Sequence, residues 1–178
     1  MERLLQFSGY LFVVLLVVTA VVMGLGSRMP VEHRATASAS VTAQRDRVWR
    51  MMTDVQTQPE WRTGLKSVEM LPPQTEGPCW REVQAWMSMP LCVMGSDAPS
   101  RRVVRIADPA LPFGGTWTYD LEADGPTMTK VTITEEGTTR PAMWRFFGHF
   151  VWGEDQQVKQ YLRDLQEAAG GGQAPGAM

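Results

Sequence analysis

Two glutamates stand where they could do acid–base chemistry. Glu135 follows Val131 and Ile133 at steps of two, so in a strand all three side chains point to the same face. A carboxyl group buried in an apolar cavity has a raised pKa and can serve as a general acid or base. In the alternative interpretation, which is the commoner use of such a residue, Glu135 lies at the rim or pairs with an arginine such as Arg105.

Glu82 is the second candidate, and its orientation is ambiguous. It shares one face of an expected strand with Trp80 and Trp86, but the opposite face also carries apolar residues. If the tryptophans point inward, Glu82, Arg105 and Glu135 form a polar cluster in an otherwise apolar cavity. Such a cluster could orient the headgroup of a ligand. A buried salt-bridge network would give the same sequence pattern and is weighed slightly above it.

The remaining reactive side chains fit no catalytic or metal-binding motif. His33 and His149 are far apart in sequence and are expected in a linker and on a helix face. Cys79 and Cys92 match neither a metal spacing nor a CxxC pair. They could form a disulfide in an oxidising compartment, but two buried free thiols are the preferred interpretation. The sequence carries no nucleophile elbow, P-loop or dinucleotide fingerprint, so we expect no metal and no cofactor.

The charge distribution argues against nucleic acid as a partner. The chain has 17 basic and 19 acidic residues, for a formal net charge of -2. Its one basic cluster, Arg101, Arg102 and Arg105, is too small to follow a phosphate backbone.

A strand, a short helix and a series of further strands would position these side chains. Residues Arg34 to Val41 alternate between apolar and polar types, which predicts a strand, and Arg45 to Thr53 has helical spacing. A further short helical turn is expected to carry Trp61. The later strands, each bounded by turn residues, are Leu65 to Leu71, Trp80 to Met87, Leu91 to Ser96, Arg101 to Ala107, Gly114 to Glu122 and Thr127 to Glu136. Short connections between consecutive strands predict an antiparallel sheet.

A long amphipathic helix is expected to begin near Pro141. Its apolar stripe comprises Trp144, Phe147, Val151, Val158, Tyr161 and Leu165. Gly148 and Gly153 are poor helix formers, so the first half of this helix is expected to bend or break. Residues 170–178 are expected to form a disordered tail.

These elements predict an α+β domain in which the long helix covers one face of the sheet. A curved sheet around a helix need not close tightly, so we expect an apolar cavity between them. The residues expected to line it are Trp49, Trp117, Tyr119, Leu121, Val131, Ile133, Trp144, Phe147, Val151 and Tyr161.

Several motifs in this order resemble a known superfamily. They are Val48-Trp49 followed by Asp54 and Trp61, Trp80-Arg81-Glu82-Val83, Pro99-Ser100-Arg101-Arg102, Pro112 to Trp117, and Thr132 to Gly137. Together they resemble the SRPBCC (START/Bet v 1-like) superfamily, in particular its bacterial polyketide cyclase/dehydrase and lipid transport branch, over Glu32 to Ala169. The resemblance implies a helix-grip fold, with a curved antiparallel sheet of about seven strands around a C-terminal helix. It implies no single reaction, because the superfamily includes both carriers and enzymes.

The N-terminus is expected to be a membrane anchor. No charge occurs from Leu4 to Ser27, and a helix from Leu4 to Leu25 would be about 33 Å long, enough to cross a bilayer. A signal peptide cut after Gly26 is the alternative, but the apolar stretch is long and the N-terminal charge weak. We therefore expect an anchor over residues 1–27, a linker over 28–33 and a domain over 34–169. The protein would be single-pass in a bacterial inner membrane, and the arginine counts slightly favour a cytoplasmic domain.

The leading hypothesis is a membrane-tethered module that binds a hydrophobic small molecule such as a lipid, an isoprenoid or a quinone-like compound. One alternative is an enzyme of the cyclase or dehydratase type that uses Glu135 or Glu82. Another is a protein-interaction domain with a filled core, although the sequence identifies no protein partner. Cavity volume separates the first two hypotheses from the third. A pocket of roughly 300–1,000 Å³ supports binding or catalysis, and a solid core supports the interaction domain.

Overall fold

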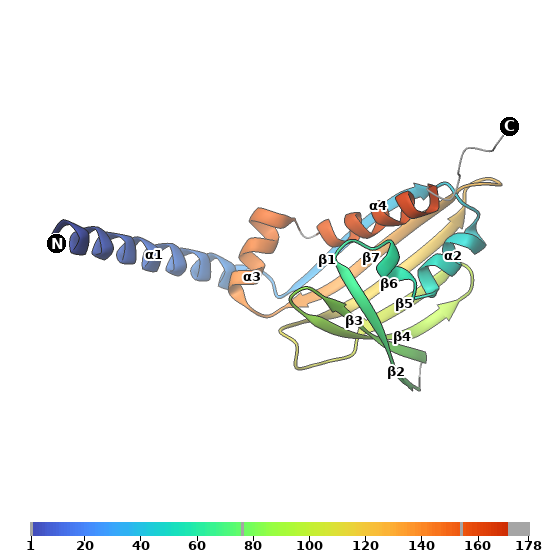
Figure 1. Ribbon diagram of the computed structural model, residues 1–178, viewed down its shortest axis with the longest axis horizontal. Coiled ribbons are helices and arrows are strands. Elements are labelled where there is room, and N and C mark those ends of the chain that lie inside the picture. The colour runs from blue at the N-terminus through green and yellow to red at the C-terminus, as the bar shows by residue number, and fades with distance from the viewer. Residues whose placement is uncertain (1, 76, 154, 171–178) are drawn as a thin grey trace.

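A seven-stranded antiparallel sheet forms the body of the domain (Figure 1). The computed structural model describes residues 2–75, 77–153 and 155–170. The strand order is β1-β7-β6-β5-β4-β3-β2. Strands β2 to β7 therefore form a meander, and its last strand, β7, also pairs with β1, the first strand of the chain. The strands are β1 Glu32–Val41, β2 Leu65–Gln74, β3 Gly77–Gln84, β4 Ser88–Asp97, β5 Arg101–Ile106, β6 Phe113–Ala123 and β7 Thr129–Thr139. The α+β class and the antiparallel sheet predicted from the sequence are confirmed.

The C-terminal helix α4 (Gln156–Gly170) packs on the sheet over β1 and β7 (Figure 1). Its buried residues Val158, Leu162 and Leu165 recur at helical spacing, so they form one apolar face. That face meets Val131 and Ile133, which alternate along β7. The predicted helix-grip arrangement is therefore present.

The expected long helix is broken. It consists of α3 (Ala142–Phe147), a π-helical turn η2 (Gly148–Trp152) and α4. Gly153 ends the π-helical turn with φ of 81°, a left-handed conformation that glycine adopts without steric cost. The predicted stripe is thus divided, and its members before Gly153 do not lie on α4.

The segment α3 packs against the end of the N-terminal helix α1 (Glu2–Arg28). The contact is close, because a Cβ placed on Gly26 would collide with the carbonyl group of Ala142. Arg145 adds a hydrogen bond from Nε to the carbonyl oxygen of Gly26, at 2.9 Å. The N-terminal helix is therefore fixed to the domain at its base.

Beyond this contact, α1 projects away from the sheet with its apolar side chains exposed (Figure 1). The segment Gln6–Arg28 is long and apolar enough to cross a membrane, a property that a signal sequence shares. Only residues 29–31 separate α1 from β1, so the expected linker over 28–33 is too long: Arg28 ends the helix, and Glu32 and His33 already belong to the sheet. Of the tail expected over residues 170–178, Gly170 is the last residue of the C-terminal helix, and residues 171–178 lie outside the described part of the chain.

Cys79 and Cys92 form a disulfide between β3 and β4. The two residues are direct cross-strand partners and are almost fully buried. The preference for two free thiols is wrong, because sequence spacing does not reveal that the strand register places these residues opposite each other.

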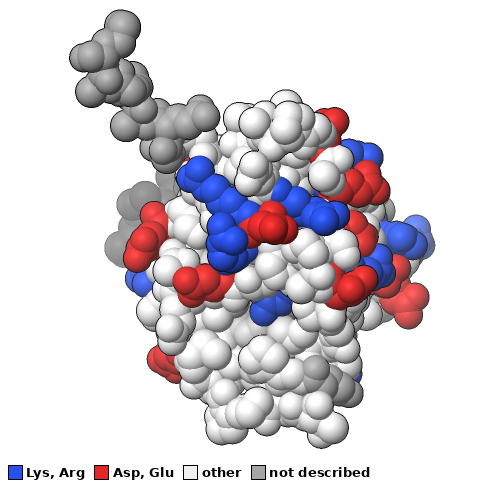
Figure 2. Space-filling model, turned by 90° about the vertical axis from the view of Figure 1, so that its right-hand side faces the viewer, with Lys and Arg blue, Asp and Glu red and all other residues white. Residues whose placement is uncertain are grey.

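On the face of the domain opposite α1, acidic and basic residues lie interspersed rather than in a patch of one sign (Figure 2). One partly exposed ion pair of the sheet joins Arg101 of β5 to Asp120 of β6, with 2.6 Å between Nη1 and Oδ1.

Candidate functional site

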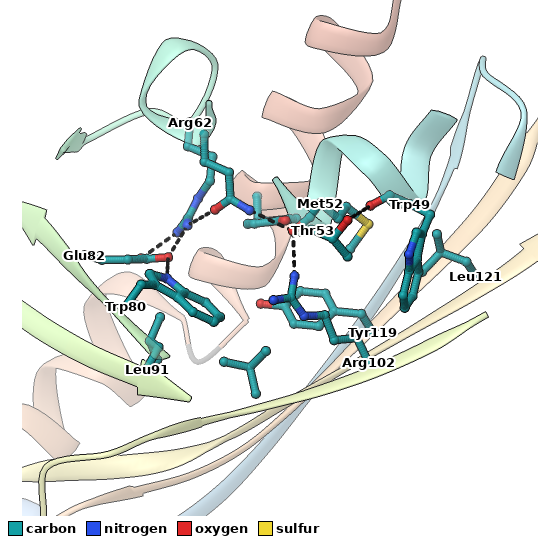
Figure 3. Close-up of a pocket in the computed structure, with 13 residues that line it drawn as sticks. Trp49, Met52, Thr53, Arg62, Trp80, Glu82, Leu91, Arg102, Tyr119 and Leu121 are labelled. Carbon is teal, nitrogen blue, oxygen red and sulfur yellow. Dashed lines mark hydrogen bonds and ion pairs between the residues drawn. The ribbon is translucent and has the colours of Figure 1, made fainter. Parts of the chain in front are cut away.

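A cavity lies between the sheet and the helical segments α2 (Arg45–Thr53), η1 (Gln58–Glu60) and α4 (Figure 3). Strands β3 to β6 form its floor, and α2 with the chain after η1 forms its roof. The lining residues are Trp49, Met52, Thr53, Gln58, Arg62, Trp80, Glu82, Leu91, Arg102, Val104, Tyr119, Leu121 and Tyr161. Its walls are thus mainly aromatic and aliphatic, with a few polar groups that converge inside.

One side of the cavity is a buried ion pair between Arg62 and Glu82. The two Arg62 Nη to Glu82 Oε distances are 2.5 and 3.1 Å, and Glu82 is only 3% exposed. Trp80 donates from Nε1 to Glu82 at 3.4 Å, and Arg62 also donates to Gln58 Oε1 at 2.8 Å. Burial lowers the pKa of Arg62, but the adjacent Glu82 carboxylate outweighs this and raises it overall. Both oxygens of Glu82 are therefore committed to a fully charged partner.

A second arginine, Arg102, enters the cavity from β5. It is 7% exposed and donates from Nη1 to the carbonyl oxygen of Met52 at 3.1 Å. Its guanidinium carbon lies 5.2 Å from the centroid of the Trp80 ring, a cation–π distance. Burial lowers the pKa of Arg102.

Two tyrosines complete the polar lining. Tyr119 of β6 and Tyr161 of α4 have ring centroids 5.7 Å apart, and the guanidinium of Arg62 lies 5.0 Å from the Tyr161 ring. Burial raises the pKa of Tyr161 to about 12, and it raises the pKa of Tyr119 further. Both hydroxyls are therefore neutral near pH 7 and can donate a hydrogen bond.

Asp164 fixes the segment that carries Arg62. This carboxylate of α4 is 5% exposed and accepts hydrogen bonds from the backbone N and the Oγ1 of Thr63, at 2.7 and 3.0 Å. Gln160 Nε2 donates to the same carboxylate at 2.7 Å. Asp164 therefore ties α4 to the roof of the cavity.

Several residues expected to line a pocket do line this cavity: Glu82, Trp49, Tyr119, Leu121 and Tyr161. Val131 and Ile133 lie instead in the apolar core below α4, and Trp117 packs against both apolar clusters of the domain. The structure resolves the ambiguity of β3, since Trp80 and Glu82 point inward. Trp86 lies beyond the end of β3 and is exposed.

Three further residues that were expected to line the pocket also lie outside the cavity, because they precede the break at Gly153. Trp144 packs on Phe113, with 5.9 Å between ring centroids, and Val151 is 59% exposed. Phe147 contacts Phe146 on the same short helix. None of the three is among the residues that line the cavity.

The expected cluster of Glu82, Arg105 and Glu135 does not exist. Arg105 is exposed on the outer face of β5, because Arg102, Val104 and Ile106 occupy its inner face. Glu135 is on the inner face of β7 and mostly buried, and its Oε1 lies 3.7 Å from His33 Nε2. It does not line the cavity that contains Glu82.

Sequence reasoning missed both arginines of the site. Arg102 carried a usable signal, because it shares the period-two row of Val104 and Ile106 just as Glu135 shares the row of Ile133. Arg62 carried none: it lies in the irregular segment between η1 and β2, where no periodicity assigns a direction.

The cavity is small. Its volume is about 20 Å³, room for about one water molecule and far below the roughly 300–1,000 Å³ of ligand pockets. By the volume criterion given in the sequence analysis, the cavity as it stands favours the filled-core alternative, so a binding function must be argued from the lining residues. Any larger ligand must displace lining side chains. A second, open depression of about 380 Å³ lies at Arg34, Ala35, Thr36, His149 and Asp155. Within the described ranges, no group of three His, Cys, Asp or Glu side chains is placed to hold a metal.

Comparison with known proteins finds a matching family model and solved structures with the same fold. The family model described as polyketide cyclase / dehydrase and lipid transport matches residues 32–170. No curated protein sequence matches the chain. Zhui aromatase/cyclase from Streptomyces sp. R1128 superposes with a TM-score of 0.65 at 14% identity, over 83% of this chain and 99% of that one.

Two further solved structures show the same fold. A START superfamily protein from Mycobacterium smegmatis has a TM-score of 0.63 at 12% identity, over 78% of this chain and 98% of its own. A protein of Thermus thermophilus has a TM-score of 0.65 at 19% identity, over 80% of this chain and 100% of its own. At these identities the likeness concerns the fold.

Proposed function

The chain belongs to the polyketide cyclase/dehydrase and lipid transport family, and on this premise we propose that it binds a hydrophobic small molecule while tethered to a membrane. The ligand would be a lipid, an isoprenoid or a quinone-like compound, held in the cavity between the sheet and α4. The tether would keep this cavity close to the bilayer, where such molecules are concentrated.

The observation that carries the proposal is the convergence of a few buried polar groups inside apolar walls. Arg62, Arg102, Tyr119 and Tyr161 come from four different segments and meet in one cavity. Small-molecule sites have this composition, with apolar walls for affinity and few polar groups for orientation. A packed core that served stability alone would gain nothing from burying these groups.

Binding is better supported than catalysis. The cyclase-like alternative requires a carboxylate that is available to exchange a proton with a substrate. Both oxygens of Glu82 are held by Arg62, and Glu135 lies outside the cavity beside His33. Neither carboxylate therefore meets the geometric requirement.

We further propose that α1 is a retained anchor and that the domain faces an oxidising compartment. The Cys79–Cys92 disulfide supports this orientation, because structural disulfides persist outside the reducing cytoplasm. This reverses the slight preference for the cytoplasmic side drawn from arginine counts. Protease added to cells whose outer envelope is opened and whose inner membrane is intact should digest the domain. A cytoplasmic domain would survive this treatment.

Photo-crosslinking of the full chain in nanodiscs tests the binding function. Diazirine-bearing lipid, isoprenoid and quinone analogues are offered to the wild type, and crosslinked peptides are identified by mass spectrometry. Crosslinks in β3 to β6 are expected with at least one analogue.

A matched pair of variants on β5 provides the control. Val104→Trp fills the cavity, because Val104 lines it, and should abolish these crosslinks. Val103→Trp enlarges the neighbouring residue on the outer face and should leave them unchanged. Leu91→Phe, a milder filling of the same cavity, guards against misfolding of the first variant. Equal labelling of all variants, or no cavity labelling of the wild type, would support the filled-core alternative.

A further inference from the structure

The side chain of Arg102 is a buried cation without a carboxylate partner. It is more than nine-tenths buried and lines the cavity. Among the described residues, no Asp or Glu oxygen lies within ion-pair distance of it, and its hydrogen bond goes to the carbonyl oxygen of Met52. A guanidinium has five N–H donors, so most of its donor capacity is not used by the protein.

The charges of the cavity do not balance. Arg62 and Glu82 neutralise each other, so Arg102 leaves a net charge of about one positive unit in the site. An ion buried without a counterion carries a large desolvation cost, and the Trp80 ring offsets only a small part of it. The other arginines of β5 avoid this cost, since Arg101 pairs with Asp120 and Arg105 is exposed to solvent.

Neutral hydrogen-bond donors accompany this cation. Tyr119 and Tyr161 line the same cavity, and their hydroxyls are protonated at neutral pH, as tyrosines ordinarily are. A positive guanidinium with two neutral hydroxyls matches an anionic group that accepts several hydrogen bonds. One negative charge suffices for balance, which a carboxylate or a phosphodiester supplies and a dianionic phosphate monoester exceeds. The carboxylate is the smaller of the two, which suits a cavity with room for about one water molecule.

We propose that the ligand carries a single carboxylate at the end of an apolar chain, as a long-chain fatty acid does, and that Arg102 binds this carboxylate. This inference rests on the proposed binding function and specifies the chemical class of its ligand. The apolar chain lies along the aromatic and aliphatic walls, which part to admit it.

Competition between an acid and its uncharged counterpart tests the inference. The full chain in neutral phosphatidylcholine nanodiscs is labelled with a diazirine-bearing long-chain fatty acid. The unlabelled acid and the alcohol of equal chain length then compete for the crosslinks. A charge-assisted hydrogen bond predicts that the acid competes about 10-fold better or more.

Two arginine variants of β5 serve as test and control. Arg102→Met should remove the preference for the acid, whereas Arg105→Met, on the opposite face of the same strand, should keep it. Thermal unfolding gives a second readout. In the absence of ligand, Arg102→Met should unfold at the same or a higher temperature than the wild type, because it removes an uncompensated buried charge. The fatty acid should stabilise the wild type and not this variant.

The outcomes separate the two proposals. Equal competition by acid and alcohol would overturn the carboxylate inference and leave the binding function standing. An acid preference that survives Arg102→Met, together with a lower unfolding temperature of that variant, would also overturn it and assign Arg102 a structural role. Failure of every lipid, isoprenoid and quinone analogue to label the wild-type cavity would instead overturn the binding function itself.

Discussion

The interior of the domain has two halves of opposite character. The apolar half lies below α4 and is built from residues such as Val41, Val131, Ile133, Val158 and Leu165, all at most 2% exposed. The charged half lies below α2 and η1, over β3 to β5. There the apolar residues surround the ion pair of Arg62 with Glu82 and the lone cation of Arg102.

The difference between the halves shows where function is to be sought. Burial of aliphatic side chains stabilises a fold at roughly 25 cal/mol per Å² and requires no partner. Burial of charge costs free energy unless every group is paired, and even then a hydrophobic replacement is often as stable. The apolar half therefore accounts for why the chain folds, whereas the charged half would be accounted for by the ligand that we propose.

Glu82→Gln should give the largest loss of stability and would sharpen the contrast. It leaves the Arg62 guanidinium buried without its counterion, which typically costs about 3–5 kcal/mol of unfolding free energy. Chemical denaturation followed by tryptophan fluorescence measures the loss. The double variant with Arg62→Met should recover most of it. Glu69→Gln, which breaks the exposed pair with Arg81, should change little. A Glu82→Gln effect as small as that of Glu69→Gln would break the comparison.

Leu165→Ala tests the apolar half. The side chain is fully buried, so its truncation leaves a cavity and should cost about 2–5 kcal/mol of unfolding free energy. Chemical denaturation measures this loss. Photo-crosslinking of the ligand should remain unchanged, because Leu165 does not line the cavity. Glu167→Ala, at an exposed position of the same helix, is the matched control. Loss of ligand binding with retained fold would show that the two halves are not separate.

Asp164→Ala tests the connection between the halves. It removes two part-buried hydrogen bonds that Thr63 donates to a charged acceptor, at a cost of about 1–3 kcal/mol of unfolding free energy. Combination with Thr63→Val in a double-mutant cycle should show non-additivity, since both variants remove the hydroxyl contact. Strict additivity would mean that Asp164 does not hold the Arg62 segment.

The two tyrosines that line the cavity predict a dependence on alkaline pH. An unfolded tyrosine ionises near pH 10, whereas the pKa of folded Tyr161 is about 12. The stability that Tyr161 contributes is therefore complete below pH 10 and is lost as the pH rises toward 12, by at most about 1.4 kcal/mol per pH unit. Denaturation between pH 9 and 12 measures it, and Tyr161→Phe should flatten the curve. An unchanged slope in this variant would contradict the burial of its hydroxyl.

Arg101→Gln should have the smallest effect. Its ion pair with Asp120 is partly exposed, so its loss should cost less than about 1 kcal/mol of unfolding free energy and should disappear at high salt. The adjacent Arg102→Met should differ in kind, with loss of acid preference rather than of stability. Similar results for both variants would remove the distinction between an exterior and a ligand-binding arginine.

Sequence periodicity predicted the strands well and the site only in part. Alternation assigned Tyr119 and Leu121 to the inner face of β6, where they line the cavity. The same rule applied to β5 would have chosen Arg102 and rejected Arg105, because Val104 and Ile106 define its inner row. The error was to choose Arg105 for its charge, without asking whether its position in the strand alternates with the inner or with the outer row.

Helical periodicity failed where glycines interrupt the chain. Trp144 and Phe147 continue the spacing of Tyr161 and Leu165 in sequence, but the left-handed Gly153 changes the direction of the chain between them. Periodicity measures angles around one straight axis, so it loses meaning across such a break. As a result α3 packs on α1, which the sequence did not suggest.

Local pattern alone determined the α+β class, the antiparallel meander, the covering helix α4 and the apolar N-terminal helix, because each depends on neighbours within a few residues. Tertiary structure alone decided which distant residues meet: Cys79 with Cys92, Arg62 with Glu82, and Asp164 with Thr63. Such contacts depend on strand register and on the course of irregular segments. Register follows from the packing of the whole sheet, so no short stretch of sequence contains it.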